Sequence, residues 1–141
     1  MQKYMEANVV FSKFARDYVA LKKDLPIRPS EMGVLSMISQ SDQDCTPMML
    51  AELFGVSKPM IAAHVQVLLK KGYIYKTASD TDKRSYFVRP TEKGKALADY
   101  FEKRQTEYIK TMEAKLGEAE FDTLVCLLQK AQTILETIKE V

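Results

Sequence analysis

The chain has 141 residues, the size of one ordinary domain, and is long enough to bury a hydrophobic core. Hydrophobic residues make up 46% and charged residues 28%, which is a globular composition, and no apolar run is long enough to span a membrane. The first residues, MQKYMEANVVF, lack the apolar stretch and cleavage site of a signal peptide, so we expect a cytoplasmic protein that does not bind membranes.

The residue types needed for metal or catalytic chemistry are scarce. Cys45 and Cys126 do not form a CxxC pair, and with a single histidine they are too few for an ordinary zinc site. His64 could exchange a proton, but no nucleophile, glycine-rich phosphate loop or ligand set accompanies it. We therefore expect no metal, no cofactor and no enzymatic activity.

Helical periodicity dominates the first part of the chain. Apolar residues spaced three and four apart predict a helix over residues 4–22, which the prolines of residues 25–29 end. Ser30 is the predicted cap of a second helix. The polar residues 39–44 then predict a loop.

The next segment has the pattern of a helix-turn-helix. Thr46-Pro47 predicts a helix start, because the threonine hydroxyl can accept an amide hydrogen and proline needs no donor there. Gly55 ends this short helix where a positive φ is needed, and Ser57 caps a second helix that runs to about Lys71. Two helices joined by such a glycine turn form a helix-turn-helix.

The second of these helices has two distinct faces. Its apolar residues, which we expect to pack on Leu50 and Leu53, are Ile61, Val65, Leu68 and Leu69. The residues predicted to face outward are Ser57, Lys58, Pro59, Ala62, Ala63 and Gln66, with Met60 and His64 near the boundary. Small outward side chains let a helix approach base edges in the DNA major groove, and a helix N-terminus favours a phosphate.

A hairpin is predicted after Gly72. Residues 73–76 and 85–89 are rich in aromatic and branched side chains and predict two short strands, joined by a polar loop over residues 78–84. Such a hairpin beside a helix-turn-helix is a wing that could reach a DNA minor groove.

Two long helices are predicted to complete the chain. Thr91 is the expected cap of a helix over residues 92–112, and a last helix covers residues 118–139 after a break at Gly117. The last helix is apolar on more than one side, so we expect it to need a partner surface beyond its own domain.

Charge is distributed unevenly along the chain. From Ser57 to Lys95 there are nine basic and three acidic residues, a net charge of +6, so the rest of the +2 chain carries −4. Basic charge concentrated on the part that could dock is typical of phosphate binding, although a solvated surface explains any single lysine equally well.

Two stretches carry a resemblance to a known family. LAELFGVSKPMIAAHVQVLLKKGYI is similar to the helix-turn-helix of the MarR family of transcriptional regulators, and DTDKRSYFVRPTEKG resembles its wing. The resemblance spans essentially the whole chain. It implies a mainly α (α+β) fold, a winged helix-turn-helix with a two-stranded wing and with dimerisation helices at both ends. In a single domain over residues 1–141, residues 30–95 would bind DNA, and residues 1–25 and 96–141 would form a homodimer.

The resemblance also implies a set of contacts to a pseudo-palindromic double-stranded operator. The implied DNA-binding residues are Thr46, Ser57, Lys58, Pro59, Ala63, His64, Gln66, Asp82, Lys83 and Arg84. Arg84 would enter the minor groove and Asp82 would hold it in position. Because Ala62 and Ala63 occupy the middle of the recognition helix, we expect few direct hydrogen bonds to bases and a larger role for the wing.

From the same resemblance we expect a repressor released by an aromatic or amphipathic small molecule that binds between the dimerisation helices and the winged helix. Three alternatives remain open. The winged helix could be a protein-interaction module, although its basic charge argues against this. Cys45 could sense oxidants, although relatives that sense peroxide keep a reactive cysteine in the first helix, where this chain has none. The eight methionines could line a ligand pocket, although filling core gaps is their commoner use.

Overall fold

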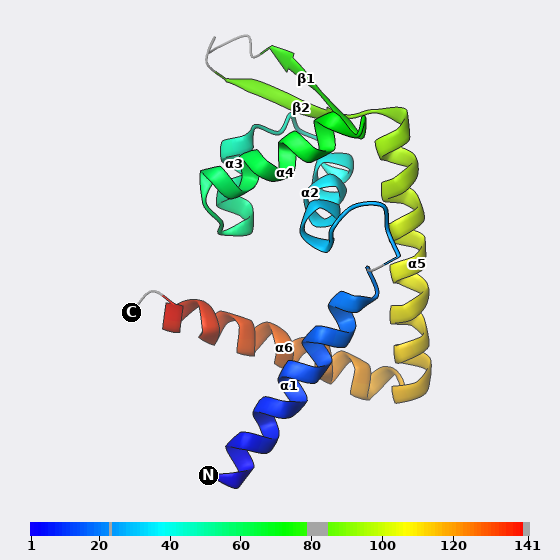
Figure 1. The fold of residues 1–141 in the computed structure, drawn as a ribbon. Coiled ribbons are helices and arrows are strands. Elements are labelled where there is room, and N and C mark those ends of the chain that lie inside the picture. The colour runs from blue at the N-terminus through cyan, green and yellow to red at the C-terminus, as the bar shows by residue number, and fades with distance from the viewer. Residues whose placement is uncertain (23, 79–84, 140–141) are drawn as a thin grey trace. The chain divides into compact units, whose positions relative to one another are not determined.

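The computed structural model describes residues 1–22, 24–78 and 85–139 (Figure 1). Its elements, in chain order, are α1 (Gln2–Ala20), α2 (Pro29–Gln40), α3 (Pro47–Phe54), α4 (Lys58–Lys70), β1 (Ile74–Ala78), β2 (Tyr86–Pro90), α5 (Glu92–Leu116) and α6 (Glu118–Lys139). Six helices and one antiparallel hairpin confirm the predicted fold class. The chain divides between residues 102 and 103 into two compact units, and α5 passes from one to the other.

The hydrophobic core of the first unit lies among α2, α3, α4 and the hairpin, which Figure 1 shows grouped together. Its most deeply buried side chains are Met32, Val34, Leu35, Leu50, Ile61, Val65, Leu68 and Val88. Leu50 is buried, as expected for a residue that packs on α4. Leu53 was predicted to pack there too, and this prediction is wrong, because Leu53 is 60% exposed. Only one face of this eight-residue helix packs on the core. Leu50 and Ala51 lie on that face, and Leu53 does not.

The start of α2 differs from the prediction. Arg28, not Ser30, is the N-cap, and Pro29 occupies the first helical position. Proline is favoured there because its missing N–H would have no partner in the helix. The Glu31 carboxylate accepts a hydrogen bond of 2.9 Å from the Arg28 amide, and Glu31 is the one buried charged side chain among the described residues. The helix therefore begins before the serine that the sequence pattern favoured.

The caps of the helix-turn-helix are confirmed. The Thr46 hydroxyl accepts the Met49 amide at 3.2 Å, and the Ser57 hydroxyl accepts the Met60 amide at 3.3 Å. Between the two helices Gly55 has φ of +63°, a left-handed conformation that most residues adopt only at a cost. The turn from α3 into α4 is thus determined locally by a cap, a glycine and a second cap.

The hairpin has a register from Ile74 opposite Pro90 to Ala78 opposite Tyr86. Its strands begin one residue later than predicted, and β2 includes Pro90 at its end. A further contact was not predicted: the Val88 amide donates to the Cys45 carbonyl at 2.8 Å, which makes an isolated bridge beside β2. This bridge joins the wing to the segment that precedes α3.

The beginning of α5 is attached to the end of α4. The Thr91 hydroxyl accepts the Gly94 amide at 3.0 Å, which confirms the predicted cap, and donates to the Gly72 carbonyl at 2.7 Å. The Thr91 amide donates to the Tyr73 carbonyl at 3.0 Å. The helix runs to Leu116, four residues beyond the predicted end, and the predicted break at Gly117 is present with φ of +92°.

The terminal helices leave their apolar residues uncovered. Within their described lengths, neither α1 nor α6 contains a buried residue. The large apolar side chains most exposed on α1 are Tyr4, Met5, Val9, Val10 and Phe11, and those on α6 are Leu127, Leu128, Ile134, Leu135 and Ile138. Each helix therefore presents an apolar surface that a single chain does not cover.

Candidate nucleic-acid interface

The predicted recognition residues lie together on one exposed surface of α4. The exposed residues of this surface are Ser57, Lys58, Pro59, Met60, Ala62, Ala63 and Gln66, and His64 is partly buried at its edge. The opposite side of the helix carries the buried Ile61, Val65 and Leu68, so the outer surface is free of core packing. We call these eight residues the α4 surface.

The electrostatics of the helix-turn-helix favour an anion. The first turns of α3 and α4 contain no acidic residue, and neither does that of α1, whereas the first turns of α2, α5 and α6 contain Glu31, Glu92 and Glu118. A helix N-terminus carries partial positive charge and backbone amides that attract phosphate. Lys58 adds a full positive charge in the first turn of α4.

The base of the wing carries basic and aromatic side chains. Lys76 of β1 places its ammonium 4.4 Å from the centre of the Tyr86 ring, and Arg89 of β2 forms an ion pair with Asp44. Thr46, which is partly buried, uses its hydroxyl oxygen to cap α3. The predicted wing contacts Asp82, Lys83 and Arg84 lie outside the described residues, and their roles stay predictions.

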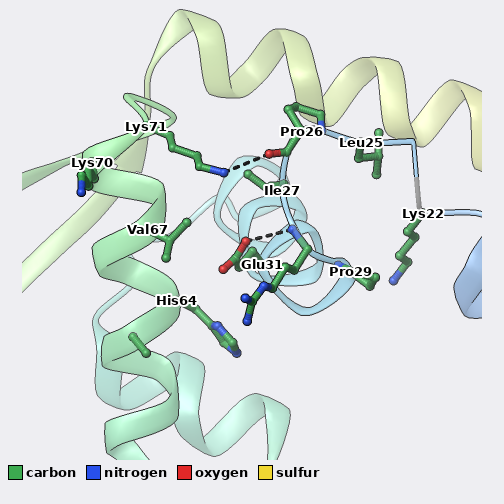
Figure 2. Close-up of a pocket in the computed structure, with 12 residues that line it drawn as sticks. Lys22, Leu25, Pro26, Ile27, Pro29, Glu31, His64, Val67, Lys70 and Lys71 are labelled. Carbon is green, nitrogen blue, oxygen red and sulfur yellow. Dashed lines mark hydrogen bonds between the residues drawn. The ribbon is translucent and has the colours of Figure 1, made fainter.

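An open pocket of about 940 Å³ lies between α4 on one side and Lys22 and residues 25–31 on the other (Figure 2). Figure 2 shows His64 and Val67 of α4 on one side and Glu31 on the other. The basic residues that line it are Lys22, Arg28, Lys70 and Lys71, and the apolar ones include Leu25, Ile27 and Val67. Sequence reasoning missed this pocket, because its two walls are far apart in the chain and share no motif.

One hydrogen bond joins the two walls of this pocket. The Lys71 ammonium donates to the Pro26 carbonyl at 3.0 Å, which connects the end of α4 to the segment before α2 (Figure 2). No methionine is among the described residues that line the pocket, which argues against a methionine-lined ligand site there.

The structure disfavours thiol sensing through Cys45. Its side chain is 5% exposed, and its sulfur lies 3.7 Å from the Gln43 carbonyl oxygen. A redox-sensing thiol needs to be accessible. Cys126 is exposed on α6.

The described residues contain no group of three or more histidine, cysteine, aspartate or glutamate side chains placed to hold a metal ion. In the same parts of the chain, none of the helices combines the length and the apolar character that crossing a membrane requires.

A family model matches the middle of the chain. The model of the MarR family matches residues 25–85, which run from the segment before α2 to the residue before β2. This part of the chain is similar to the MarR family. The matched range contains both caps, the glycine turn and the whole α4 surface, and with them the first of the two stretches that carried the resemblance in sequence.

Solved structures share the MarR-type fold over nearly the whole chain. FabT from Streptococcus pneumoniae, in complex with DNA, is 19% identical, with 97% of each chain covered and a TM-score of 0.79. MepR from S. aureus, also a DNA complex, is 18% identical over 89% of this chain and 96% of its own, with a TM-score of 0.80. A MarR/EmrR family regulator from Acinetobacter sp. ADP1 is 25% identical over 96% of each chain, with a TM-score of 0.71. No curated protein sequence matches this chain.

Proposed function

We propose that this protein is a cytoplasmic transcriptional regulator of the MarR family that binds double-stranded DNA sequence-specifically and has no enzymatic activity. The α4 surface carries the proposal, because it combines small exposed side chains with a helix N-terminus that lacks acidic residues. The net charge of +6 from Ser57 to Lys95 supplies the attraction for phosphate. The similar structures of FabT and MepR are DNA complexes, which supports the same assignment.

The binding mode follows from the shape of the α4 surface. The N-terminal half of α4 enters the major groove, with Lys58 near a phosphate and Ala63 close to base edges and thymine methyl groups. Arg84 of the wing enters the adjacent minor groove, where the negative potential attracts its guanidinium. His64 and Gln66 contribute the polar contacts that the alanines do not.

We assign the uncovered apolar residues of α1 and α6 to a homodimer interface. Burial of apolar surface is the main driving force of association, and both helices leave theirs exposed in one chain. A two-fold dimer presents two α4 surfaces, which fit successive major grooves of a pseudo-palindrome about one helical turn apart.

The effector occupies the pocket that α4 forms with Lys22 and residues 25–31. Four basic side chains around apolar ones suit an amphipathic or aromatic acid, whose carboxylate pairs with the cations while its ring covers Ile27 and Val67. A ligand there competes with the hydrogen bond between Lys71 and Pro26 and so displaces α4. In this mode of regulation the protein represses transcription, and binding of such a ligand relieves the repression.

Binding to the DNA upstream of its own gene tests the function. A gel-shift titration of that fragment should show binding that weakens steeply as the salt concentration rises. Arg84→Ala should lose most of this binding while sedimentation still shows a dimer, and Lys130→Ala, which removes one positive charge from α6, should bind like wild type. Equal binding by Arg84→Ala and wild type would remove the wing from the mechanism.

The same fragment tests the effector site. Aromatic monocarboxylates should release the wild-type protein from DNA and should be less effective on Lys70→Gln, which removes a cation from the pocket wall. Release of both proteins at the same ligand concentration would place the effector elsewhere.

One observation favours the alternative function, a protein-interaction module. α3 exposes Met48 and Leu53, and the α4 surface itself includes the exposed Met60. Binding of a protein partner that is unaffected by salt and by added DNA, together with no shift of any DNA fragment, would support this alternative.

A further inference from the structure

We propose that Asp44 is a positioning residue, which holds the wing in a fixed direction relative to the helix-turn-helix through its ion pair with Arg89. This proposal rests on the proposed DNA-binding function, because it explains how a wing contact and a major-groove contact are made at the same time.

Three consecutive residues attach β2 to α3. Asp44 forms an ion pair with Arg89 through its side chain, and Cys45 accepts the Val88 amide at 2.8 Å through its carbonyl. The next residue, Thr46, caps α3 by accepting the Met49 amide at 3.2 Å. The segment from Asp44 to Thr46 therefore connects the strand of the wing directly to the first helix of the helix-turn-helix.

The wing needs such an attachment. A two-stranded hairpin is marginally stable by itself and can pivot about its ends. The hydrogen bonds of Thr91 to Gly72 and Tyr73 hold the base of the hairpin, and the contact between Cys45 and Val88 holds the middle of β2. Successive side chains of a strand point to opposite faces, so the buried Val88 and the exposed Arg89 hold β2 from both sides. The ion pair adds a contact through the side chain next to Val88, on the opposite face of β2, and so helps to define the direction of the hairpin.

Because the ion pair is exposed, its effect on the direction of the wing can be measured apart from any effect on the stability of the protein. The Arg89 and Asp44 side chains are 46% and 40% exposed, and ion pairs so accessible to water contribute little to the free energy of unfolding. Loss of the pair should therefore change the mobility of the wing and leave the thermal stability of the protein nearly unchanged. Asp44 would also repel nearby phosphates if it were unpaired, and Arg89 neutralises it.

The chain offers a matched control. Asp44→Asn and Asp42→Asn remove the same charge from the same loop, and Asp42 is an exposed residue there. Because both variants gain equally in attraction for phosphate, any difference between them reports the contact with Arg89. The DNA probe is a duplex selected by the wild-type protein from a random-sequence library.

The first measurement is made without DNA. Backbone ¹⁵N relaxation should show greater mobility of Tyr86 to Arg89 in Asp44→Asn than in Asp42→Asn, at equal melting temperatures. Equal relaxation in the two variants overturns the proposal whether or not the protein binds DNA. Failure of the wild-type protein to select any duplex would instead overturn the proposed function, and the relaxation result would still decide the role of Asp44.

The second measurement uses the selected duplex. Asp44→Asn should bind about fivefold more weakly than Asp42→Asn, which is the size expected for one coupled contact. Its hydroxyl-radical footprint should lose minor-groove protection at the outer edges and keep the major-groove contacts of α4. The double variant Asp44→Arg with Arg89→Asp keeps the net charge and should restore affinity that each single change lowers. A double variant as weak as Arg89→Asp would mean that Arg89 itself binds DNA, which overturns the positioning role.

Discussion

Replacing Gly94 with alanine should separate the start of α5 from the end of α4. A Cβ atom at Gly94 would lie 2.0 Å from the Tyr73 carbonyl oxygen, and contacts below 3.0 Å are essentially never observed. The two backbones must therefore move apart by about 1 Å. That shift lengthens the hydrogen bonds from Thr91 to the Gly72 and Tyr73 carbonyls, now 2.7 and 3.0 Å, beyond the usual range.

The expected cost follows from these contacts. Two weakened hydrogen bonds of about 1 kcal/mol each, together with the strain of an overpacked site, give a loss of about 3 kcal/mol in the free energy of unfolding. Gly33→Ala is the matched control, because its Cβ would meet only the Phe54 ring, at 3.8 Å. In the middle of α2 that change should stabilise the protein by about 0.5–1 kcal/mol.

Urea unfolding followed by circular dichroism measures both variants, at one protein concentration because the stability of a dimer depends on it. Gly94→Ala should have the lower midpoint and Gly33→Ala the higher. If Gly94→Ala unfolded within about 0.5 kcal/mol of wild type, α5 would not be packed on the turn after α4 as described.

Two further changes separate the roles of the helices. Ser57→Asp should keep the stability of the protein, because aspartate caps a helix as well as serine does. It should weaken DNA binding by about tenfold or more, because a negative charge then faces phosphate, and unchanged affinity in a gel shift would place DNA away from the start of α4. Leu128→Lys should convert the protein to a monomer in sedimentation velocity, because it puts a charge on the apolar surface of α6. A dimer that persists at the same concentration would move the interface away from α6.

The parts of the fold that the sequence predicted are those with a local cause. Thr46, Ser57 and Thr91 cap the helices assigned to them, and Gly55 takes the left-handed turn, because each interaction joins residues that are neighbours in the chain. At the start of α2 a local rule had two candidates: Ser30 has a capping side chain, but Arg28 is the cap and the helix begins at Pro29, two residues earlier than a cap at Ser30 would place it.

What the sequence did not reveal depends on contacts between distant residues. The bridge between Cys45 and Val88 and the ion pair between Asp44 and Arg89 join segments that only the folded chain brings together. The exposure of Leu53 was missed for the same reason, since an apolar residue on a short helix shows no preferred side until its partners are placed. The exposed positions of α4 follow from the periodicity of one helix, whereas the DNA contacts assigned to them and to Asp82, Lys83 and Arg84 stay predictions.

The central claim is that the α4 surface reads DNA bases, and a change in sequence preference tests it most directly. Random-sequence duplexes would be selected by wild type, by Ala63→Gln and by Ala96→Gln, the last placing the same side chain at an exposed position of α5. Because glutamine pairs with adenine in the major groove, Ala63→Gln should select a new base at one position in each half-site, while Ala96→Gln should select the wild-type sequence. An identical consensus from all three proteins would contradict base reading by α4.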